Sequence, residues 1–492
     1  MSRSSHKGGD AEKRTPERHD IPLSVQIFTY LSYAMLMAVG YLRDFFANLF
    51  YSNPHPGYAP LVRDYDDFFQ RRLYRRIRDC WNRPIDSRPG RIIGVMERVS
   101  HDFNKTYHVT GKIIPSINLG SYNYLGFAED TPFVTDEVCE SLERFGLSMC
   151  SSAMEAGQSA PVEALEKAIS SFVGKEDAVV CGMGFATNFG GIPALFDKET
   201  LVLSDSNNHA SLVAGVRSSG CKVKVFPHNN LSALESMIRS EVISGQPRTH
   251  KRWRRIVIVV EGIYSMEGII VDLATIVKIK KKYRALLFVD EAHSIGAIGV
   301  TGRGVCEHNG VDPHDVDILM GTFTKSFGSI GGYIASDKKL IDHIRRTSVV
   351  SLTCDSLAAP CAQQALSVLK VLLGEDGTDL GRRRIQQLAE NSKYFRGELI
   401  KLGLTVYGDD ASPVVPVMLY NPGKMPAFSR KCLARNVAVV VVGYPATTLI
   451  ESRVRFCVSA CHTREDLNYT VGVIKEVMEE CYLEYEPKRR RS

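Results

Sequence analysis

Short apolar runs alternate with amphipathic stretches along most of the chain from residue 92 onward. Residues 257–260, 286–289 and 318–320 are apolar runs bounded by polar or glycine positions, which is typical of buried strands. Residues 273–284 lie between two of these runs and have the periodicity of a helix. Strands that alternate with helices predict an α/β fold with a mainly parallel sheet.

The pattern changes near Ser356. Two long helical stretches, residues 357–373 and 380–401, come before short strands at residues 414–419 and 438–442. Helices grouped before strands predict a separate, smaller C-terminal α+β domain. The sequence contains no visible internal repeat that would indicate a solenoid or an array of modules.

The beginning of the chain combines a polar tail with an apolar run. Residues 1–20 are rich in both charges, so we expect a disordered tail. Residues 21–42 carry no charge, and these 22 residues match the roughly 20 that a bilayer core requires. Because polar side chains dilute the run, it either spans a membrane or lies in its interface. A buried core helix is the alternative, whereas the length of the run and the lack of an Ala-x-Ala site disfavour a cleaved signal peptide.

Composition narrows the class of protein. The chain has 492 residues, of which 44% are hydrophobic and 24% charged, and these values exclude wholesale disorder and a fibrous class. Its 12 cysteines include no Cys-x-x-Cys pair, so zinc ribbons and dithiol redox motifs are not expected and no metal site is predicted. Cysteines scattered through a long chain favour reduced thiols that face the cytosol.

The net charge of +6 is too mild to demand a nucleic-acid partner. Much of it lies in three basic clusters at residues 71–78, 248–255 and 488–491, and the rest of the chain is acidic. Local basic clusters on an acidic body favour a cytosol-facing domain against an anionic membrane over a nucleic-acid binder. For residues 71–78, a solvated helix face paired with Asp64, Asp66 and Asp67 fits the sequence as well.

Two short segments carry the chemistry, LFVDEAHS at residues 287–294 and GTFTKSFG at residues 321–328. Asp290 ends an apolar strand and His293 follows it, where ligands of open parallel sheets bind. Lys325 follows the next apolar run, among hydroxyl residues and glycines. Such an amine suits a phosphorylated aldehyde, because the lysine forms a Schiff base, hydroxyl and N–H groups hold the phosphate, and the aspartate pairs with a pyridinium nitrogen. A lone lysine there would be a surface residue on a turn, but the pairing with Asp290 and His293 disfavours that interpretation.

On these motifs, and on RFCVSACHT at residues 455–463, the segment 117–463 resembles the α-oxoamine synthases, and among them most closely the serine palmitoyltransferases. The resemblance implies an aspartate-aminotransferase-like transferase of fold type I that uses pyridoxal 5′-phosphate (PLP). It also implies the following division of the chain: a tail at 1–20, a membrane segment at 21–42, a linker with part of the small domain at 43–110, a large PLP-binding domain at 111–355, a small C-terminal domain at 356–485 and a basic tail at 486–492.

The resemblance further implies a role for each matching residue. Lys325 would bind the cofactor aldehyde and remove the substrate α-proton, and Asp290 would pair with the pyridine nitrogen. Arg455 would bind the amino-acid carboxylate. The remaining implied contacts are His293 with the ring hydroxyl, His209 stacked on the ring, the amides of Gly184 and Phe185 and the hydroxyl of Thr322 with the phosphate, Ser265 at the ring edge, and Asn123 at the substrate. Taken alone, His209 would cap a helix, and Ser265 and Thr322 would be turn residues.

The implied activity is the decarboxylative condensation of L-serine with palmitoyl-CoA to 3-ketodihydrosphingosine, the first step of sphingolipid biosynthesis. The implied assembly is an obligate heterodimer with long-chain-base subunit 1, together with small membrane regulatory subunits, on the cytosolic face of the endoplasmic reticulum. Two related functions stay open: a synthase that joins glycine to an acyl-CoA, and a non-catalytic scaffold subunit, against which Lys325 argues. A membrane-tethered binding protein without chemistry is disfavoured by the complete set of Lys, Asp, His and Arg.

Three positions depart from the family pattern. Ala153 stands where an arginine usually follows Cys-Ser-Ser, and Val162 stands near a usual histidine. Serine palmitoyltransferases usually carry Pro-Ala-Thr-Pro in an active-site loop, and here Thr448 replaces the last proline. The Thr448 change removes one restraint on φ, so we expect a looser loop without loss of the site.

Overall fold

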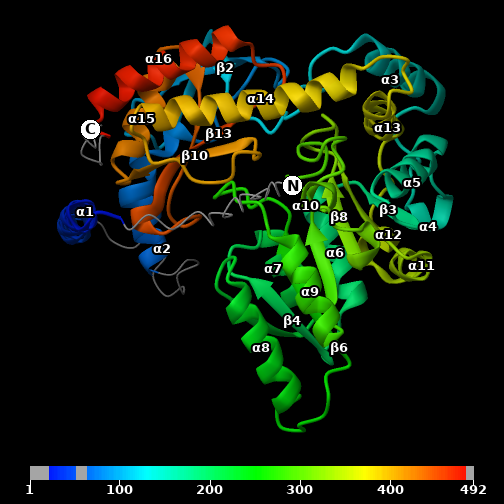
Figure 1. Ribbon diagram of the computed structural model, residues 1–492. Helices are drawn as coiled ribbons and strands as arrows, with labels where there is room; N and C mark the ends of the chain where they lie inside the picture. The colour runs from blue at the N-terminus through cyan, green and yellow to red at the C-terminus, as the bar shows by residue number, and fades with distance from the viewer. Residues whose placement is uncertain (1–20, 51–63, 484–492) are drawn as a thin grey trace, which may run out of the picture.

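A computed structural model describes residues 21–50 and 64–483 (Figure 1), so the tails predicted at 1–20 and 486–492 and the basic residues 488–491 lie outside the described residues. The helices are α1 Leu23–Phe50, α2 Asp64–Phe68, α3 Pro132–Phe145, α4 Ala153–Ala156, α5 Ala160–Phe172, α6 Gly184–Leu195, α7 Ala210–Ser218, α8 Leu231–Ser244, α9 Leu273–Tyr283, α10 Val305–Asn309, α11 Lys338–Thr347, α12 Val349–Thr353, α13 Ala359–Leu373, α14 Leu380–Lys401, α15 Lys424–Ala434 and α16 Arg464–Glu480. The strands are β1 Ile92–Val99, β2 His108–Asn118, β3 Asp177–Cys181, β4 Thr200–Asp205, β5 Lys222–Phe226, β6 Arg255–Glu261, β7 Leu286–Asp290, β8 Ile318–Thr322, β9 Gly332–Ser336, β10 Val414–Tyr420, β11 Val437–Ala438, β12 Val440–Val442 and β13 Ser452–Cys457.

The central sheet has the strand order β3-β9-β8-β7-β6-β4-β5. Strand β9 runs antiparallel to both of its neighbours, and β8, β7, β6, β4 and β5 pair in parallel. The predicted strands at 257–260, 286–289 and 318–320 are β6, β7 and β8, and they lie side by side. The prediction of an α/β fold with a mainly parallel sheet is confirmed.

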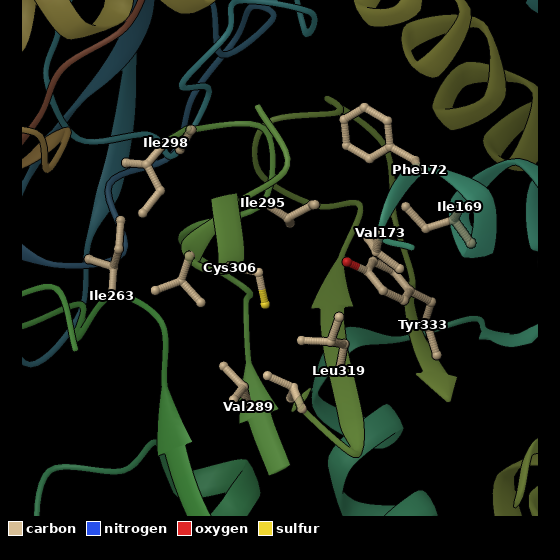
Figure 2. Packing of buried hydrophobic residues seen from close by; sticks show 14 of the residues in the cluster. Ile169, Phe172, Val173, Ile263, Val289, Ile295, Ile298, Cys306, Leu319 and Tyr333 are labelled. Atoms are coloured by element: carbon tan, nitrogen blue, oxygen red, sulfur yellow. The ribbon is translucent and has the colours of Figure 1, made fainter. Parts of the chain in front are cut away.

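Both faces of the central sheet are covered by helices. Ile258 and Val260 of β6 point to the core shared with α5, α8, α9 and α13, and Val257 and Val259 point to the core shared with α6, α7 and α11. Figure 2 shows the first of these cores, where Val289 and Leu319 of the sheet face Ile169 and Phe172 of α5. Burial of both faces explains why these strands appear in the sequence as continuous apolar runs.

Two smaller sheets lie in the C-terminal half of the fold. One has the order β10-β13-β12 and is antiparallel. In the other, β2 is the central strand, and it pairs with β1 on one side and with β11, from near the end of the chain, on the other. These strands share a separate core with α14, α15 and α16. Helix α13 packs against α3 and α5 in the core of the central sheet, so residues 356–485 contribute to both cores. The domain boundary at residue 356 therefore stays a prediction.

Helix α1 lies at the edge of the molecule, apart from the central sheet (Figure 1). Its residues 23–46 are long and apolar enough to cross a membrane, with a mean hydropathy of 1.4 and only 11% of the most apolar stretch buried. The helix continues past the predicted end at residue 42, because the charge of Asp44 is neutralised by Arg71 Nη1 at 2.9 Å and by Arg72 Nε at 2.7 Å. Two of the basic residues in the 71–78 cluster therefore bind the protein itself.

Aromatic contacts connect α1 to the C-terminal half of the chain. Tyr41 of α1 stacks on Phe68 with ring centroids 4.2 Å apart. The next residue, Phe69, lies with its ring edge-on to Tyr444 at 5.3 Å. Tyr444 immediately precedes the loop of residues 445–448, so this loop lies beside the segment that follows α1.

Candidate active site

The candidate site lies where three parallel strands end. Glu261, Asp290 and Thr322 are the last residues of β6, β7 and β8, which are neighbours in the sheet. All three side chains are buried. The carboxyl ends of parallel strands are the usual ligand-binding edge of such a sheet, so the fold itself brings these residues to one place.

Lys325 lies in the turn after β8. The turn is fixed by the Ser329 N–H, which donates to Phe323 O at 2.9 Å, and by Ser326 Oγ, which donates to Ile295 O at 2.8 Å. Burial, together with the cation of Arg455, lowers the pKa of Lys325 to about 8, against the opposing effects of Asp290 and Glu261. A substantial fraction of this amine is therefore neutral near physiological pH.

Asp290 is held by an amide from α6. Its Oδ2 accepts from Asn188 Nδ2 at 2.8 Å, and its Oδ1 accepts from the Ala292 N–H at 2.9 Å. Asn188 Nδ2 also donates to Ser211 Oγ at 3.0 Å, and its Oδ1 is buried without a hydrogen-bond partner among the described residues. Asn188 was not among the predicted site residues, although it lies four residues after Gly184.

His293 lies in the same site as Lys325 and Arg455. Its Nδ1 is 2.8 Å from the hydroxyl of Tyr124, and the ring of Tyr122 lies edge-on to it at 5.1 Å. Burial, together with the cations of Lys325 and Arg455, lowers the pKa of His293 well below its usual range. The imidazole is therefore neutral. Both tyrosines flank Asn123 in the sequence, which was the signal available for finding them.

His209 begins α7 and caps it, as the alternative interpretation of this residue predicted. Its Nδ1 accepts from the Ser211 N–H at 3.2 Å, and its main-chain N–H donates to Glu261 Oε1. The imidazole is solvent-exposed and lies edge-on to Phe185 at 6.2 Å. Partial burial and the cation of Lys325 lower the pKa of His209, while Asp290 opposes them. The His209 side chain is thus accessible to a ligand.

The N-terminus of α6 provides a place for an anion. Gly184 is the first residue of this helix and Phe185 the second, and no side chain caps the helix. The first N–H groups of a helix lack intrahelical acceptors. A Cβ atom added to Gly184 would lie 2.8 Å from Thr322 Oγ1, so the backbone at this position remains bare. Thr322 Oγ1 donates to Gly331 O at 2.8 Å and must rotate to serve an anion.

Arg455 reaches the site from β13 of the C-terminal sheet. Its guanidinium carbon lies 4.8 Å from the centre of the Tyr122 ring, and its Nη1 lies 3.7 Å from Met266 Sδ and 3.5 Å from Ser265 O. Its Nε is buried without a hydrogen-bond partner among the described residues. A buried guanidinium with unused donors is suited to bind a carboxylate.

The side chain of Asn123 is bonded to backbone groups nearby. Its Nδ2 donates to Pro89 O at 3.1 Å, and its Oδ1 accepts from the Ala128 N–H at 3.2 Å. These bonds fix the turn that carries Tyr122 and Tyr124. Contact of Asn123 with substrate stays a prediction, and the geometry favours a structural role.

A cavity of about 780 Å³ adjoins the site. It is lined by Asn208, Met266 and Arg453 and by the loop of residues 444–448. Asn208 precedes His209 in the chain, and Met266 contacts Arg455, so the cavity lies beside these two site residues.

These residues fit PLP. A buried amine with a lowered pKa, a buried carboxylate, an accessible imidazole and bare helix N–H groups match its aldehyde, ring nitrogen, ring face and phosphate. The orphaned Asn188 Oδ1 and Arg455 Nε show that the polar groups of the site are not all satisfied within the described part of the chain.

Comparison with known proteins agrees with this geometry. The family model for class I and II aminotransferases matches residues 114–474. Serine palmitoyltransferase 2 of Dictyostelium discoideum is 51% identical over 455 residues, which are 92% of this chain and 93% of that protein. Long chain base biosynthesis protein 2a of Arabidopsis thaliana is 51% identical over 95% of this chain and 97% of its own length. A solved structure of SPT with a PLP internal aldimine is 28% identical and matches with a TM-score of 0.70, over 79% of this chain and 93% of that one.

Proposed function

The chain belongs to the class I and II aminotransferase family, and we propose that it is the catalytic subunit of a serine palmitoyltransferase, a PLP-dependent acyltransferase of sphingolipid biosynthesis. The reaction is the decarboxylative condensation of L-serine with palmitoyl-CoA to 3-ketodihydrosphingosine, with release of CoA and CO₂. The observation that carries this proposal is the buried Lys325 beside Asp290, with Arg455 facing the same site. A scaffold subunit would have no use for a lysine in this setting.

Each residue of the site has a proposed part in holding PLP, which supplies an electron sink for the α-carbon of an amino acid. Lys325 holds the aldehyde, and Asp290, oriented by Asn188, faces the ring nitrogen. A neutral His293 that accepts from Tyr124 at Nδ1 keeps its proton on Nε2, where it can donate to the ring hydroxyl. The open face of His209 covers the ring, Ser265 lies at its edge, and the N–H groups of Gly184 and Phe185 with the hydroxyl of Thr322 bind the phosphate.

The chain's own residues also account for substrate handling. Arg455 binds the carboxylate of serine, because its guanidinium is buried and its Nε has no partner among the described residues. Lys325 removes the α-proton of serine, for which its lowered pKa of about 8 is suited. The cavity lined by residues 444–448 accommodates the acyl-CoA next to the site.

The proposed partner is long-chain-base subunit 1. Exposed apolar side chains of α4, α6, α12 and the segment before α4 adjoin the phosphate end of the site: Leu147, Met149, Met154, Met183, Phe185, Phe189, Val349 and Leu352. Apolar surface of this kind is typical of a protein interface. The heterodimer is tested by size-exclusion chromatography of the chain alone and with the first subunit. We also propose that the complex includes small regulatory subunits and that it lies at the endoplasmic reticulum, with α1 in the membrane.

Substrate choice tests the proposed function. The purified complex should convert radiolabelled serine and palmitoyl-CoA to a long-chain base, and radiolabelled glycine should give no product. A preference for glycine would instead assign the chain to another α-oxoamine synthase activity.

A further inference from the structure

A second buried carboxyl stands beside Asp290. Glu261 ends β6 and pairs in register with Asp290 at the end of β7. Partners in a parallel register point to the same face of a sheet, which here is the face covered by α6 and α7. Glu261 is 5% exposed and Asp290 is 4% exposed, so two carboxyls adjoin in a nearly dry place.

The contact made by Glu261 differs from that of Asp290. Glu261 Oε1 accepts the main-chain N–H of His209. This N–H belongs to the residue that caps α7, and the preceding Asn208 is tied to Val259 O of β6 at 2.8 Å. The start of α7 is therefore fixed to the end of β6 by one carboxyl and one amide.

Two adjoining buried carboxyls do not both carry a charge easily. Burial and the negative charge of Asp290 raise the pKa of Glu261 well above its usual range. Glu261 therefore ionises less readily than an exposed glutamate, and the contact that it makes is with the main-chain N–H of His209.

We propose that Glu261 is a positioning residue of the active site, which holds the backbone of His209 and thereby sets the imidazole against the PLP ring. This inference rests on the proposed function, through the role given there to His209. Glu261 touches neither substrate nor cofactor in this role, and a side-chain amide oxygen should replace its carboxyl oxygen.

Two variants of nearly equal shape test the proposal. Glu261→Gln keeps an acceptor oxygen, and Glu261→Met removes it while keeping the length of the side chain. The apoproteins are titrated with PLP, and affinity is measured together with the circular dichroism that the chiral site induces in the cofactor. We expect the Met variant to bind PLP about tenfold more weakly with an altered signal, since a buried N–H loses its partner, and the Gln variant to retain both properties.

Glu291 provides a matched control, because it is a buried glutamate that directly follows Asp290 in the chain. Its carboxylate accepts from Ser294 Oγ at 2.6 Å and from the Val305 N–H at 2.9 Å. Glu291→Gln should leave the induced signal unchanged. Wild-type affinity and signal in the Met variant would overturn the proposal, as would a Gln variant as impaired as Met. If the Met variant does not fold, a Gln variant impaired in affinity or signal would still overturn the proposal. PLP binding needs neither serine nor acyl-CoA. These measurements therefore test the role of Glu261 even if the protein does not catalyse the proposed reaction.

Discussion

The amine of Lys325 lies among two carboxyls and one guanidinium, and its pKa of about 8 reflects burial acting against Asp290 and Glu261. Arg455 contributes a further lowering from across the site. An exposed lysine, with a pKa near 10.5, would be almost fully charged at the same pH. The chemistry at this residue therefore depends on groups contributed by three different strands.

The first prediction concerns pH. Only the neutral amine attacks an aldehyde, and the neutral fraction of Lys325 saturates above its pKa. The rate at which the apoprotein takes up PLP should therefore rise with pH to about 8 and then level off. Stopped-flow absorbance measures this rate directly. A rate that continues to climb far into the alkaline range would show that the amine behaves as an ordinary lysine.

The second prediction removes the amine. Lys325→Ala should abolish the visible absorption of the bound cofactor and lower the condensation rate at least about 10²- to 10⁴-fold, the range expected for a lost acid–base group. Absorbance and product formation are measured on the same preparation. Lys401→Ala, in an exposed ion pair with Glu398, is the control and should retain both properties. Full activity in the Lys325 variant would refute its catalytic role.

The sequence was sufficient to predict Lys325, Asp290 and His293 as candidate site residues, because each lies in a short motif next to an apolar strand, and the structure places all three at the ends of neighbouring strands. It was not sufficient to find their partners. Asn188 lies 102 residues from Asp290, and Tyr124 lies 169 residues from His293. Such pairs form only because the fold brings distant segments together, and no local sequence pattern predicts which segments become neighbours. Asn123 is the opposite case. Its motif predicted contact with substrate, but its side chain is bonded to the backbone of Pro89 and Ala128.

Among the elements, those buried on both sides were the easiest to predict. Strands β6, β7 and β8 extend only one to three residues beyond the predicted runs. Helix α1 was harder, because it continues through Arg43 and Asp44 to Phe50. Its charged turn is stabilised by Arg71 and Arg72, which lie 27 and 28 residues later.

The third prediction concerns the loop of residues 445–448. Thr448 has φ −65° and ψ 160°, which a proline adopts without strain. Thr448→Pro should therefore raise the free energy of unfolding by ~0.4–1 kcal/mol and slow hydrogen exchange in the loop. Thermal unfolding and exchange mass spectrometry measure the two effects.

A neighbouring substitution serves as the control for this loop. The N–H of Thr447 donates to Gly443 O at 3.3 Å, so Thr447→Pro removes a hydrogen bond and should destabilise the protein. Equal effects of the two prolines would show that the loop does not keep this conformation in solution.

For the whole molecule, the basic clusters at residues 71–78 and 248–255 do not form one surface. Residues 248–254 connect α8 to β6 at the bottom of Figure 1, whereas α1 is at its left edge. Arg254 there lies 3.7 Å from both Asp197 and Glu199. Among the described residues, the cluster at 71–78 is the one next to α1. The exposed apolar surface of α1 is therefore a better indication of membrane contact than the distribution of charge.

The fourth prediction tests this surface. Leu31 and Met35 are 60% and 67% exposed and lie one turn apart on α1. A lysine costs about 2.5–3.5 kcal/mol at the centre of a membrane helix, so Leu31→Lys with Met35→Lys should release the protein from membranes. Fractionation after an alkaline wash measures the release. Ile243→Lys on α8, at a site 77% exposed, should have no effect, and retention of the α1 variant would exclude a membrane role for this face.

The pairing of the first strands with the last has a consequence for synthesis on the ribosome. Trp81 Nε1 donates to Val441 O from 360 residues away, and Arg91 binds Asp466 across 375 residues. Strand β2 likewise cannot pair with β11 until β11 has been synthesised, and Ile117 and Leu119 share their core with α16. The segment that follows α1 therefore remains unpaired until nearly the whole chain has emerged. Contacts between residues this far apart in the sequence form slowly. The nascent chain therefore exposes apolar strands to chaperones throughout most of its translation.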